Sequence, residues 1–367
     1  MLTHPGTSIL PGAFVGAETS AASGREFLTG VAAGYEVMER MASDFIPSVM
    51  SRGFHAGPVF GIFGPAVAVA KMLKLTEDEV NSTIALCVHL AAGNLEGPRS
   101  GGTALREGAA VRNAMLAVAL ARSGQVGGDT TLEGEAGFYH AYTGNNKGLL
   151  SQSFVGETHA SLEEITEGLG EDWMFLETLY RIYSTAGYNI AHVDVSAQLC
   201  IEHDIKYEDV ERVEAVVNWM ETQYPSPAFP SRRETSDAQP GSTPYYTAYG
   251  VARRGFPVLK SQQMGVADGG GDPPEVLDLM HRVKIIPSHE MTLFGPRITV
   301  FTKDGKSFTK QSTGREFMWD FEEEVRRIRD VIPGLPIPAG QFEEVISVCR
   351  SLETQDRAAQ LVELTIK

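Results

Sequence analysis

Residues 51–70 read SRGFHAGPVFGIFGPAVAVA, an unusually apolar run in a chain of 367 residues. Pro58 suits the first turn of a helix, and the positions after it carry no polar side chain until Lys71. A helix without a polar face belongs inside a protein core. The run therefore predicts a helix over 58–73 that is buried on all sides, with other helices packed around it.

His55 lies between Gly53 and Gly57 at the start of this helix, and its ring has two interpretations. The field at a helix N-terminus favours an anion and opposes protonation of the ring, which suits a neutral base near pH 7. Alternatively, the ring only caps the helix through one nitrogen. His4, in THPGTS, precedes a helix start in the same manner, although chain termini are commonly disordered.

The sequence around this run is helical and rich in alanine and glycine. Ser/Thr-x-x-Glu pairs with the spacing of a capping box open three predicted helices: Ser23 with Glu26, Thr76 with Glu79, and Ser161 with Glu164. A further helix, EGAAVRNAMLAVALARSG, ends near Gly124. Residues 1–178 are therefore predicted to form a helical bundle whose small residues permit close approach of helices.

The pattern changes after about residue 178. VERVEAVVNW (210–219) and PRITVFTKDGKSFTKQ (296–311) alternate and are β-branched, and Asp304-Gly305 is a strong hairpin signal. Asp272 and Pro273 have the pattern of an N-cap and a first helical position. We expect a mainly α protein with a second, smaller α+β domain over 179–335, and a C-terminal helical segment, 336–367, that packs back on the first domain.

Bulk composition narrows the class of protein. The chain is longer than the about 250–300 residues of a usual single core, so two domains are expected. A formal net charge of −16 argues against a nucleic-acid or anionic-membrane surface. No run of 18 apolar residues and no signal peptide occur, and three cysteines lie far apart. We expect a soluble, cytoplasmic protein with reduced thiols.

Common site motifs are missing from the sequence. The histidines and cysteines show no paired metal-ligand spacing, so no metal is predicted. DGGGD (268–272) follows no buried strand and has no phosphate-binding lysine, which indicates a turn rather than a nucleotide site. No Gly-x-Ser-x-Gly nucleophile elbow occurs.

Two stretches gather polar groups in glycine-rich settings. GNLEGPRSGGTALREGAA (93–110) places Arg99 and Arg106 before and within a helix, where guanidiniums suit bidentate carboxylate binding, unless they are ordinary surface arginines. LYRIYSTAGYNIAHVDV (179–195) has a density of polar and aromatic side chains that is typical of a site between domains, or of a structural hinge. Its polar and aromatic residues are Arg181, Tyr183, Tyr188, His192 and Asp194.

The order of these stretches resembles the 2-methylcitrate dehydratase family, also called MmgE/PrpD, from residue 3 to the C-terminus. HPGTSILPGA, RGFHAGPVFGIFG and YSTAGYNIAHVDVSAQL carry the resemblance, and the Arg-Gly-Phe-His segment is the most specific. It implies a helical domain and a smaller α+β domain with a cofactor-free cleft between them, usually in homodimers. Relatives include 2-methylcitrate dehydratase, cis-aconitate decarboxylase and an iminodisuccinate epimerase, which all move a proton beside a carboxylate of a small polycarboxylate.

The resemblance therefore implies a cofactor-independent lyase acting on a small di- or tricarboxylate. A dicarboxylate epimerase and a catalytically silent dimeric member are the alternatives. His4 and His55 match histidines of the family's site, so both are expected to be catalytic. The residues expected to bind substrate are Arg99, Thr103, Arg106, Arg181 and Tyr183.

The chain also departs from the family pattern. Many relatives have a lysine where Thr103 aligns, a histidine where Arg106 stands and a lysine where Arg181 falls. Arginine binds carboxylates but does not readily exchange a proton, so the role of a lysine does not pass to it. Relatives also carry about 90–100 further residues before the His-Pro segment, so we expect either a truncated chain or a short family member.

Overall fold

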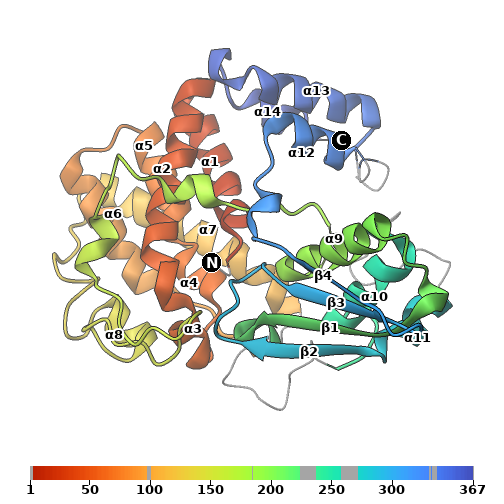
Figure 1. The fold of residues 1–367 in the computed structure, drawn as a ribbon. Coiled ribbons are helices and arrows are strands. Elements are labelled where there is room, and N and C mark those ends of the chain that lie inside the picture. The colour runs from red at the N-terminus through yellow and green to blue at the C-terminus, as the bar shows by residue number, and fades with distance from the viewer. Residues whose placement is uncertain are drawn as a thin grey trace. The chain divides into compact units, whose positions relative to one another are not determined.

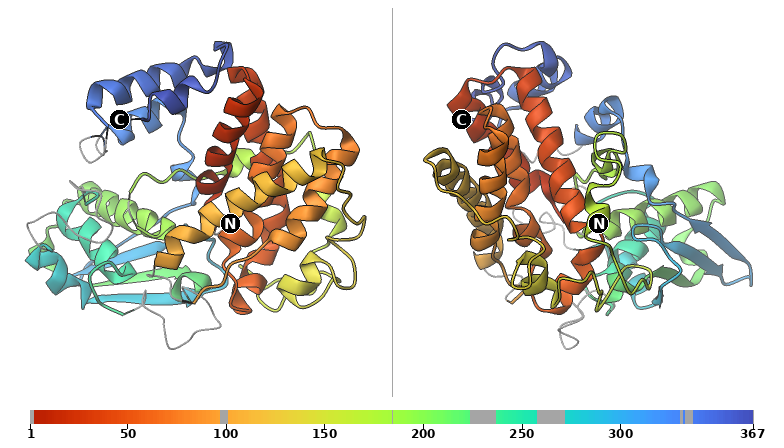
Figure 2. Two further views of the ribbon diagram at one scale, coloured as in Figure 1. Left: turned by 180° about the vertical axis from the view of Figure 1, so that it is seen from behind. Right: turned by 90° about the vertical axis from the view of Figure 1, so that its left-hand side faces the viewer.

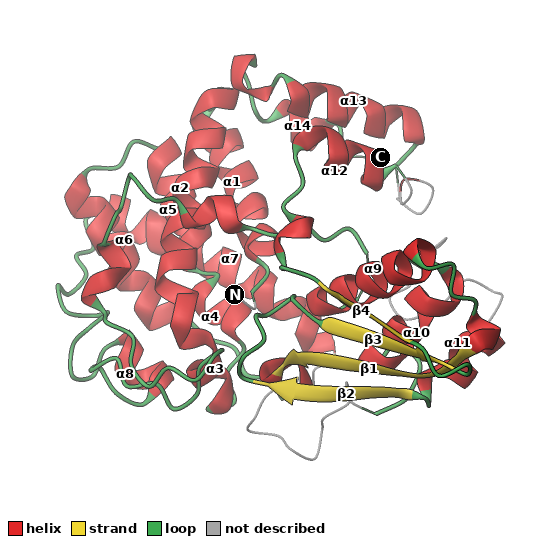
Figure 3. Cartoon of the chain, viewed as in Figure 1, coloured by secondary structure: helices red, strands yellow, loops and turns green. Residues whose placement is uncertain are grey.

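The computed structural model describes residues 3–96, 101–183, 185–223, 237–257, 272–329, 332 and 337–366, without the side chains of residues 101–104. The chain divides into two compact units (Figure 1). The first unit comprises Met1–Ser153, Glu157–Thr178 and Gly340–Lys367, and the second comprises Phe154–Gly156 and Leu179–Ala339. The helical first unit and the α+β second unit confirm the predicted fold class (Figure 3).

The first unit is a bundle of helices, which Figure 2 shows from two further sides. Its helices are α1 (Pro5–Ser20), α2 (Gly24–Ala42), α3 (Ile46–Ser51), α4 (Ala56–Phe60), α5 (Phe63–Met72), α6 (Glu77–Leu90), α7 (Gly101–Arg122), α8 (Phe138–Thr143), α13 (Ala339–Arg350) and α14 (Gln360–Glu363). Helix α5 packs against α1, α2, α6 and α7. It is therefore the centre of the bundle.

The apolar run is buried as predicted, but it forms two helices instead of one. Every residue from Ala56 to Ala70 is buried, and Lys71 is exposed. The single helix predicted over 58–73 is wrong because α4 ends at Phe60 and α5 begins at Phe63. Pro65 has no N–H with which to bond the carbonyl of Gly61, so the helical hydrogen bonds are interrupted at that point.

Two of the three predicted capping boxes are present. Ser23 with Glu26 opens α2, and Thr76 with Glu79 opens α6, each with both reciprocal hydrogen bonds. The helix predicted at Ser161 is wrong, because only a single 3₁₀ turn forms there, over Glu163–Thr166.

The cause of this difference is Arg40, a buried residue of α2. Its guanidinium pairs with Glu36 and donates hydrogen bonds to backbone carbonyls of the segment that follows Ser161. The accepting carbonyls belong to Ile165, Glu167, Gly168 and Asp172. A regular helix would use such carbonyls internally, so the segment wraps around the arginine instead.

The C-terminal segment is held to the start of α2 by backbone hydrogen bonds. The N–H of Gly24 donates to the carbonyl of Gln355 (2.8 Å), and the N–H of Ala358 donates to the carbonyl of Ala22 (2.9 Å). Both bonds lie within the first unit.

The second unit is built on a four-stranded sheet of order β2-β1-β3-β4. Its strands are β1 (Val210–Asn218), β2 (Val283–Ser288), β3 (Arg297–Thr302) and β4 (Ser307–Gln311), and only the pair β1–β2 is parallel. Helices α9 (Gly187–Glu202), α10 (Thr243–Arg253) and α11 (Pro274–Met280) share one apolar core with β1 and β3 (Figure 1). Helix α12 (Phe321–Ile328) completes the described helices of this unit.

Local predictions for the second unit are mostly confirmed. The strand over 210–219 is β1, and Asp304-Gly305 joins β3 to β4, with Gly305 at φ +84°. The helix start is shifted by one residue, because Pro273 and not Asp272 is the N-cap of α11. The Asp272 carboxylate instead accepts a hydrogen bond from the Tyr245 hydroxyl (2.7 Å). Within the described residues, no helix has the length and apolar character needed to cross a bilayer.

Candidate functional site

His55 is held in place by a short backbone pairing. Phe54 and Asn94 form an isolated antiparallel bridge, and the N–H of His55 donates to the carbonyl of Gly93 (3.2 Å). Gly53 accepts the N–H of Leu95 (2.9 Å) on the other side of the bridge. His55 is the N-cap residue of α4, but its ring makes no capping hydrogen bond. The interpretation of the ring as a simple helix cap is therefore wrong.

The ring of His55 faces a carboxylate from α7. Nδ1 lies 3.8 Å from Oε1 of Glu107, and the two side chains are 19% and 21% exposed. Gly57 leaves the room for this approach, since a Cβ at that position would lie 2.5 Å from Oε1 of Glu107 and 2.8 Å from Cε1 of His55. The pair therefore depends on a residue without a side chain at position 57.

The environment keeps the imidazole of His55 neutral. Burial lowers its pKa to about 3, and the charges of Arg106 and His4 act in the same direction. The predicted neutral ring is therefore confirmed, but the cause differs from the expectation. Helix α4 has only five residues, so removal of the ring from water replaces the helix field as the main effect.

Arg106 is the cation of this site. Nη1 donates to the carbonyl of Asn94 (2.8 Å), the residue that pairs with Phe54. Its buried Nε has no hydrogen-bond partner in the part of the chain that the structure describes. The hydrogen bonds between residues 53–55 and 93–95 thus position the backbone that carries the imidazole of His55. The carbonyl of Asn94, in the same pairing, positions the guanidinium of Arg106.

His4 stands at the N-cap of α1, directly before Pro5. Its carbonyl accepts hydrogen bonds from the N–H (3.0 Å) and the hydroxyl (2.7 Å) of Thr7. Its side chain is exposed, and its charge contributes to the low pKa of His55. The two predicted catalytic histidines are therefore electrostatically coupled.

None of the other predicted substrate contacts is a described side chain of the first unit. Arg99 lies outside the described residues, and Thr103 lies in α7 without a described side chain. Arg181 and Tyr183 belong to the second unit. Arg181 donates to the carbonyl of Thr185 (2.8 Å), and the ring of Tyr183 stacks on Phe256 with centroids 4.1 Å apart. Their roles stay predictions.

Glu107 was not among the predicted site residues, although the helix pattern holds a signal for it. The buried positions of α7 form a stripe at helical spacing: Ala110, Ala114, Ala117, Val118 and Ala121. Glu107 continues this stripe three residues before Ala110. A carboxylate on an otherwise apolar stripe is a functional candidate, because burying it needs a compensating partner.

The sequence profile of the MmgE/PrpD N-terminal domain matches residues 2–149. This stretch contains His4, His55, Arg106 and Glu107. By this match, residues 2–149 are similar to an MmgE/PrpD N-terminal domain.

Curated relatives of the chain include proteins of two Aspergillus species. It is 29% identical over 195 residues to the cis-aconitate decarboxylase-like protein oryM of Aspergillus oryzae, a match that covers 50% of this chain and 39% of that protein. The chain is 28% identical over 204 residues to the cis-aconitate decarboxylase of Aspergillus terreus, a match that covers 53% of this chain and 39% of that protein. The matches thus span less than half of the relatives' length.

His192, outside the MmgE/PrpD domain, is enclosed in the second unit. The side chain is fully buried, with Nδ1 2.8 Å from Oγ1 of Thr247 and Nε2 3.2 Å from Oε2 of Glu221. Both ring nitrogens have partners and no part of the ring meets solvent. His192 therefore has the character of a core histidine, not of a group that meets substrate.

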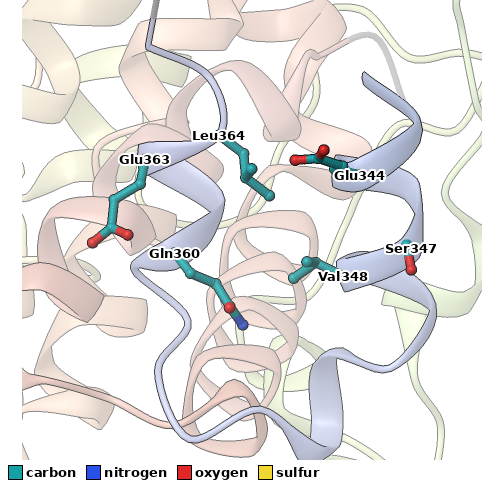
Figure 4. A pocket seen from close by; sticks show the side chains of 6 residues that line it. All are labelled: Glu344, Ser347, Val348, Gln360, Glu363 and Leu364. Atoms are coloured by element: carbon teal, nitrogen blue, oxygen red, sulfur yellow. The ribbon is translucent and has the colours of Figure 1, made fainter. Parts of the chain in front are cut away.

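A hollow of about 420 Å³ between α13 and α14 offers a second place for a ligand (Figure 4). Its lining residues are Glu344, Ser347, Val348, Gln360, Glu363 and Leu364. This lining carries two carboxylates and no basic side chain, so its charge opposes an anion. The His55 site in the MmgE/PrpD domain, with its arginine, is the better match to an acidic ligand.

Proposed function

We propose that the chain is a cofactor-independent lyase of the dehydratase or decarboxylase type, which acts on a small di- or tricarboxylate. The observation that carries this proposal is the neutral imidazole of His55 beside the guanidinium of Arg106. The family of residues 2–149 and the decarboxylase names of the relatives support the same reaction class.

His55 is proposed to be the base of the reaction. In a dehydration, the C–H bond beside a substrate carboxylate breaks and its proton bonds to the imidazole. The electron pair passes through an enolate-like carboxylate into the new C=C bond as the β C–O bond breaks, and the hydroxyl leaves as water with a proton from a second acid. A nearby cation such as Arg106 offsets the charge that develops. A resting pKa of about 3 makes His55 a weak base, and the negative charges of a bound polycarboxylate raise it towards the working pH.

His4 is proposed to assist as the second proton carrier. It is exposed and coupled to His55 by charge, so it can exchange protons with solvent. Arg99, Thr103, Arg181 and Tyr183 are proposed as further substrate contacts. The homodimer implied by the family resemblance belongs to the same proposal, and light scattering of the purified chain tests it.

Turnover in D₂O tests the function. The chain is incubated with 2-methylcitrate, citrate, cis-aconitate or an iminodisuccinate-type acid, and NMR follows product formation and deuterium uptake. A lyase releases a new acid, whereas an epimerase exchanges deuterium and yields only a stereoisomer. With neither change for any acid, the chain is catalytically silent, and thermal shifts then report whether it still binds polycarboxylates.

The variants His55→Ala and His55→Gln test the assigned base. Loss of a general base lowers kcat by about 10²–10⁴-fold. His140→Ala is the matched control, because His140 is an exposed histidine of α8 in the same unit. Unchanged turnover by a folded His55 variant would show that the base is another residue.

A further inference from the structure

Glu107 occupies a position where a carboxylate is costly. It continues the buried stripe of α7, and its side chain is only 21% exposed. Burial raises the pKa of Glu107, while the adjacent Arg106 acts in the opposite direction. A partly buried carboxylate is retained at low cost only if a donor lies nearby.

The donor within reach is Nδ1 of His55. This nitrogen is buried and has no hydrogen-bond partner in the described part of the chain. It lies 3.8 Å from Oε1 of Glu107. This separation is longer than a hydrogen bond, but catalytic hydrogen bonds commonly tighten only when substrate binds.

The surroundings of Nδ1 also suggest different roles for the two ring nitrogens of His55. Nδ1 is enclosed, yet the side chain of His55 is 19% exposed, so solvent reaches another part of this side chain. A neutral imidazole carries its proton on one nitrogen and a lone pair on the other. If Nδ1–H faces the carboxylate, the lone pair on Nε2 is available to a ligand.

We propose that Glu107 is the positioning residue of His55: it accepts the Nδ1 proton, fixes the tautomer with a free Nε2, and balances the imidazolium formed during turnover. Only the last of these roles, the balancing of the imidazolium during turnover, rests on the proposed function. When Nε2 takes the substrate proton, the electron pair of the broken C–H bond stays on the substrate. The new positive charge on the ring then faces the Glu107 carboxylate.

The first test measures the tautomer and needs no turnover. Long-range ¹H–¹⁵N NMR of the full chain, labelled at histidine nitrogen and assigned with His55→Gln, distinguishes Nδ1–H from Nε2–H. We expect Nδ1–H in the wild type and a shift towards Nε2–H in Glu107→Leu. Glu18→Gln is the matched control, because Glu18 is an exposed glutamate of α1. Identical tautomers in wild type and Glu107→Leu would overturn the inference.

A second variant disturbs the pair without removing either partner. The added methyl of Gly57→Ala would lie 2.5 Å from Oε1 of Glu107 and 2.9 Å from Nδ1 of His55, so the carboxylate or the ring must move away. The expected tautomer shift is the same as in Glu107→Leu. Gly108→Ala, with nothing within 4 Å of the added Cβ, is the control and leaves the tautomer unchanged. A wild-type tautomer in folded Gly57→Ala would count against the inference.

The catalytic part is tested with an acid that the wild type turns over. Glu107→Gln and Glu107→Leu are expected to lower kcat by about 10²-fold with little change in KM, because the carboxylate acts through the base. Glu107→Asp restores part of the rate. If His55→Gln is inactive while Glu107→Leu keeps its kcat, the positioning role fails and the proposed function stands. If the wild type turns over no acid, the proposed function fails, but the NMR measurement of the tautomer still tests whether Nδ1–H of His55 donates to Glu107.

Discussion

Glu39 gives the sharpest test of the energetics of the helical unit. It lies in α2, is 2% exposed, and its Oε1 accepts a hydrogen bond from the Thr178 hydroxyl (3.0 Å). Burial raises the pKa of Glu39 to about 7; the Thr178 bond opposes this effect, and the charge of Glu36 adds to it. The folded protein therefore binds a proton at Glu39 more readily than the unfolded chain does.

The sign and the size of the effect on stability follow from this difference. Because the folded pKa lies above the ordinary 4.5, the stabilisation is fully present below pH 4.5 and is lost as the pH rises towards and through 7. At about 1.4 kcal/mol for each pKa unit, the folded protein loses on the order of 3 kcal/mol between pH 4.5 and pH 8.

Urea unfolding of the wild type and Glu39→Gln over pH 4.5–8 measures this effect. Glutamine keeps an oxygen that accepts from Thr178 and cannot ionise, so the variant should gain about 3 kcal/mol relative to the wild type by pH 8. Glu26→Gln is the control, and its difference from the wild type should stay nearly constant over pH 4.5–8. Lys74 and Ser23 lower the pKa of Glu26 to about 2, so the stability that it contributes is present above pH 4.5 and is lost only as the pH falls towards 2. A difference between Glu39→Gln and wild type that stays constant with pH would refute the reasoning.

Three further substitutions follow from packing in the same unit, with urea unfolding at pH 7 as the measurement. Arg40→Met leaves Glu36 buried without its cation and should cost about 3–5 kcal/mol. Replacing Glu36 as well by an apolar residue removes the unpaired charge and recovers only part of the loss, because the carbonyls that Arg40 bonds still lack their donor; equal losses would contradict this. Gly24→Ala places a Cβ 1.6 Å from the carbonyl oxygen of Leu352 and should cost about 1–3 kcal/mol, and a neutral effect would show that the C-terminal segment moves freely. Gly108→Ala fills open space in a helix and should stabilise by about 0.5–1 kcal/mol; destabilisation would contradict the described geometry.

Burial in this protein could be predicted from sequence where the signal is local. The run from Ala56 to Ala70 has no polar side chain, so every orientation of the helix buries it, and the structure agrees. The capping boxes at Ser23 and Thr76 succeed for the same reason, since each needs only residues within one turn. The pair at Ser161 has the same spacing and fails because Arg40, distant in sequence, takes the carbonyls that follow it.

The candidate site shows the same division between local and distant causes. The neutral state of His55 follows mainly from burial at the mouth of an apolar run, with the charges of Arg106 and His4 adding to it. The partner of its ring could not be predicted in that way, because Glu107 lies on another helix and the approach requires position 57 to have no Cβ. Helical periodicity places a carboxylate on the inner face of α7, and a glycine beside the histidine leaves an opening there. The packing of α4 against α7 brings the carboxylate of Glu107 to the opening beside His55. Gly57 is therefore as necessary to the His55–Glu107 pair as the two side chains that form it.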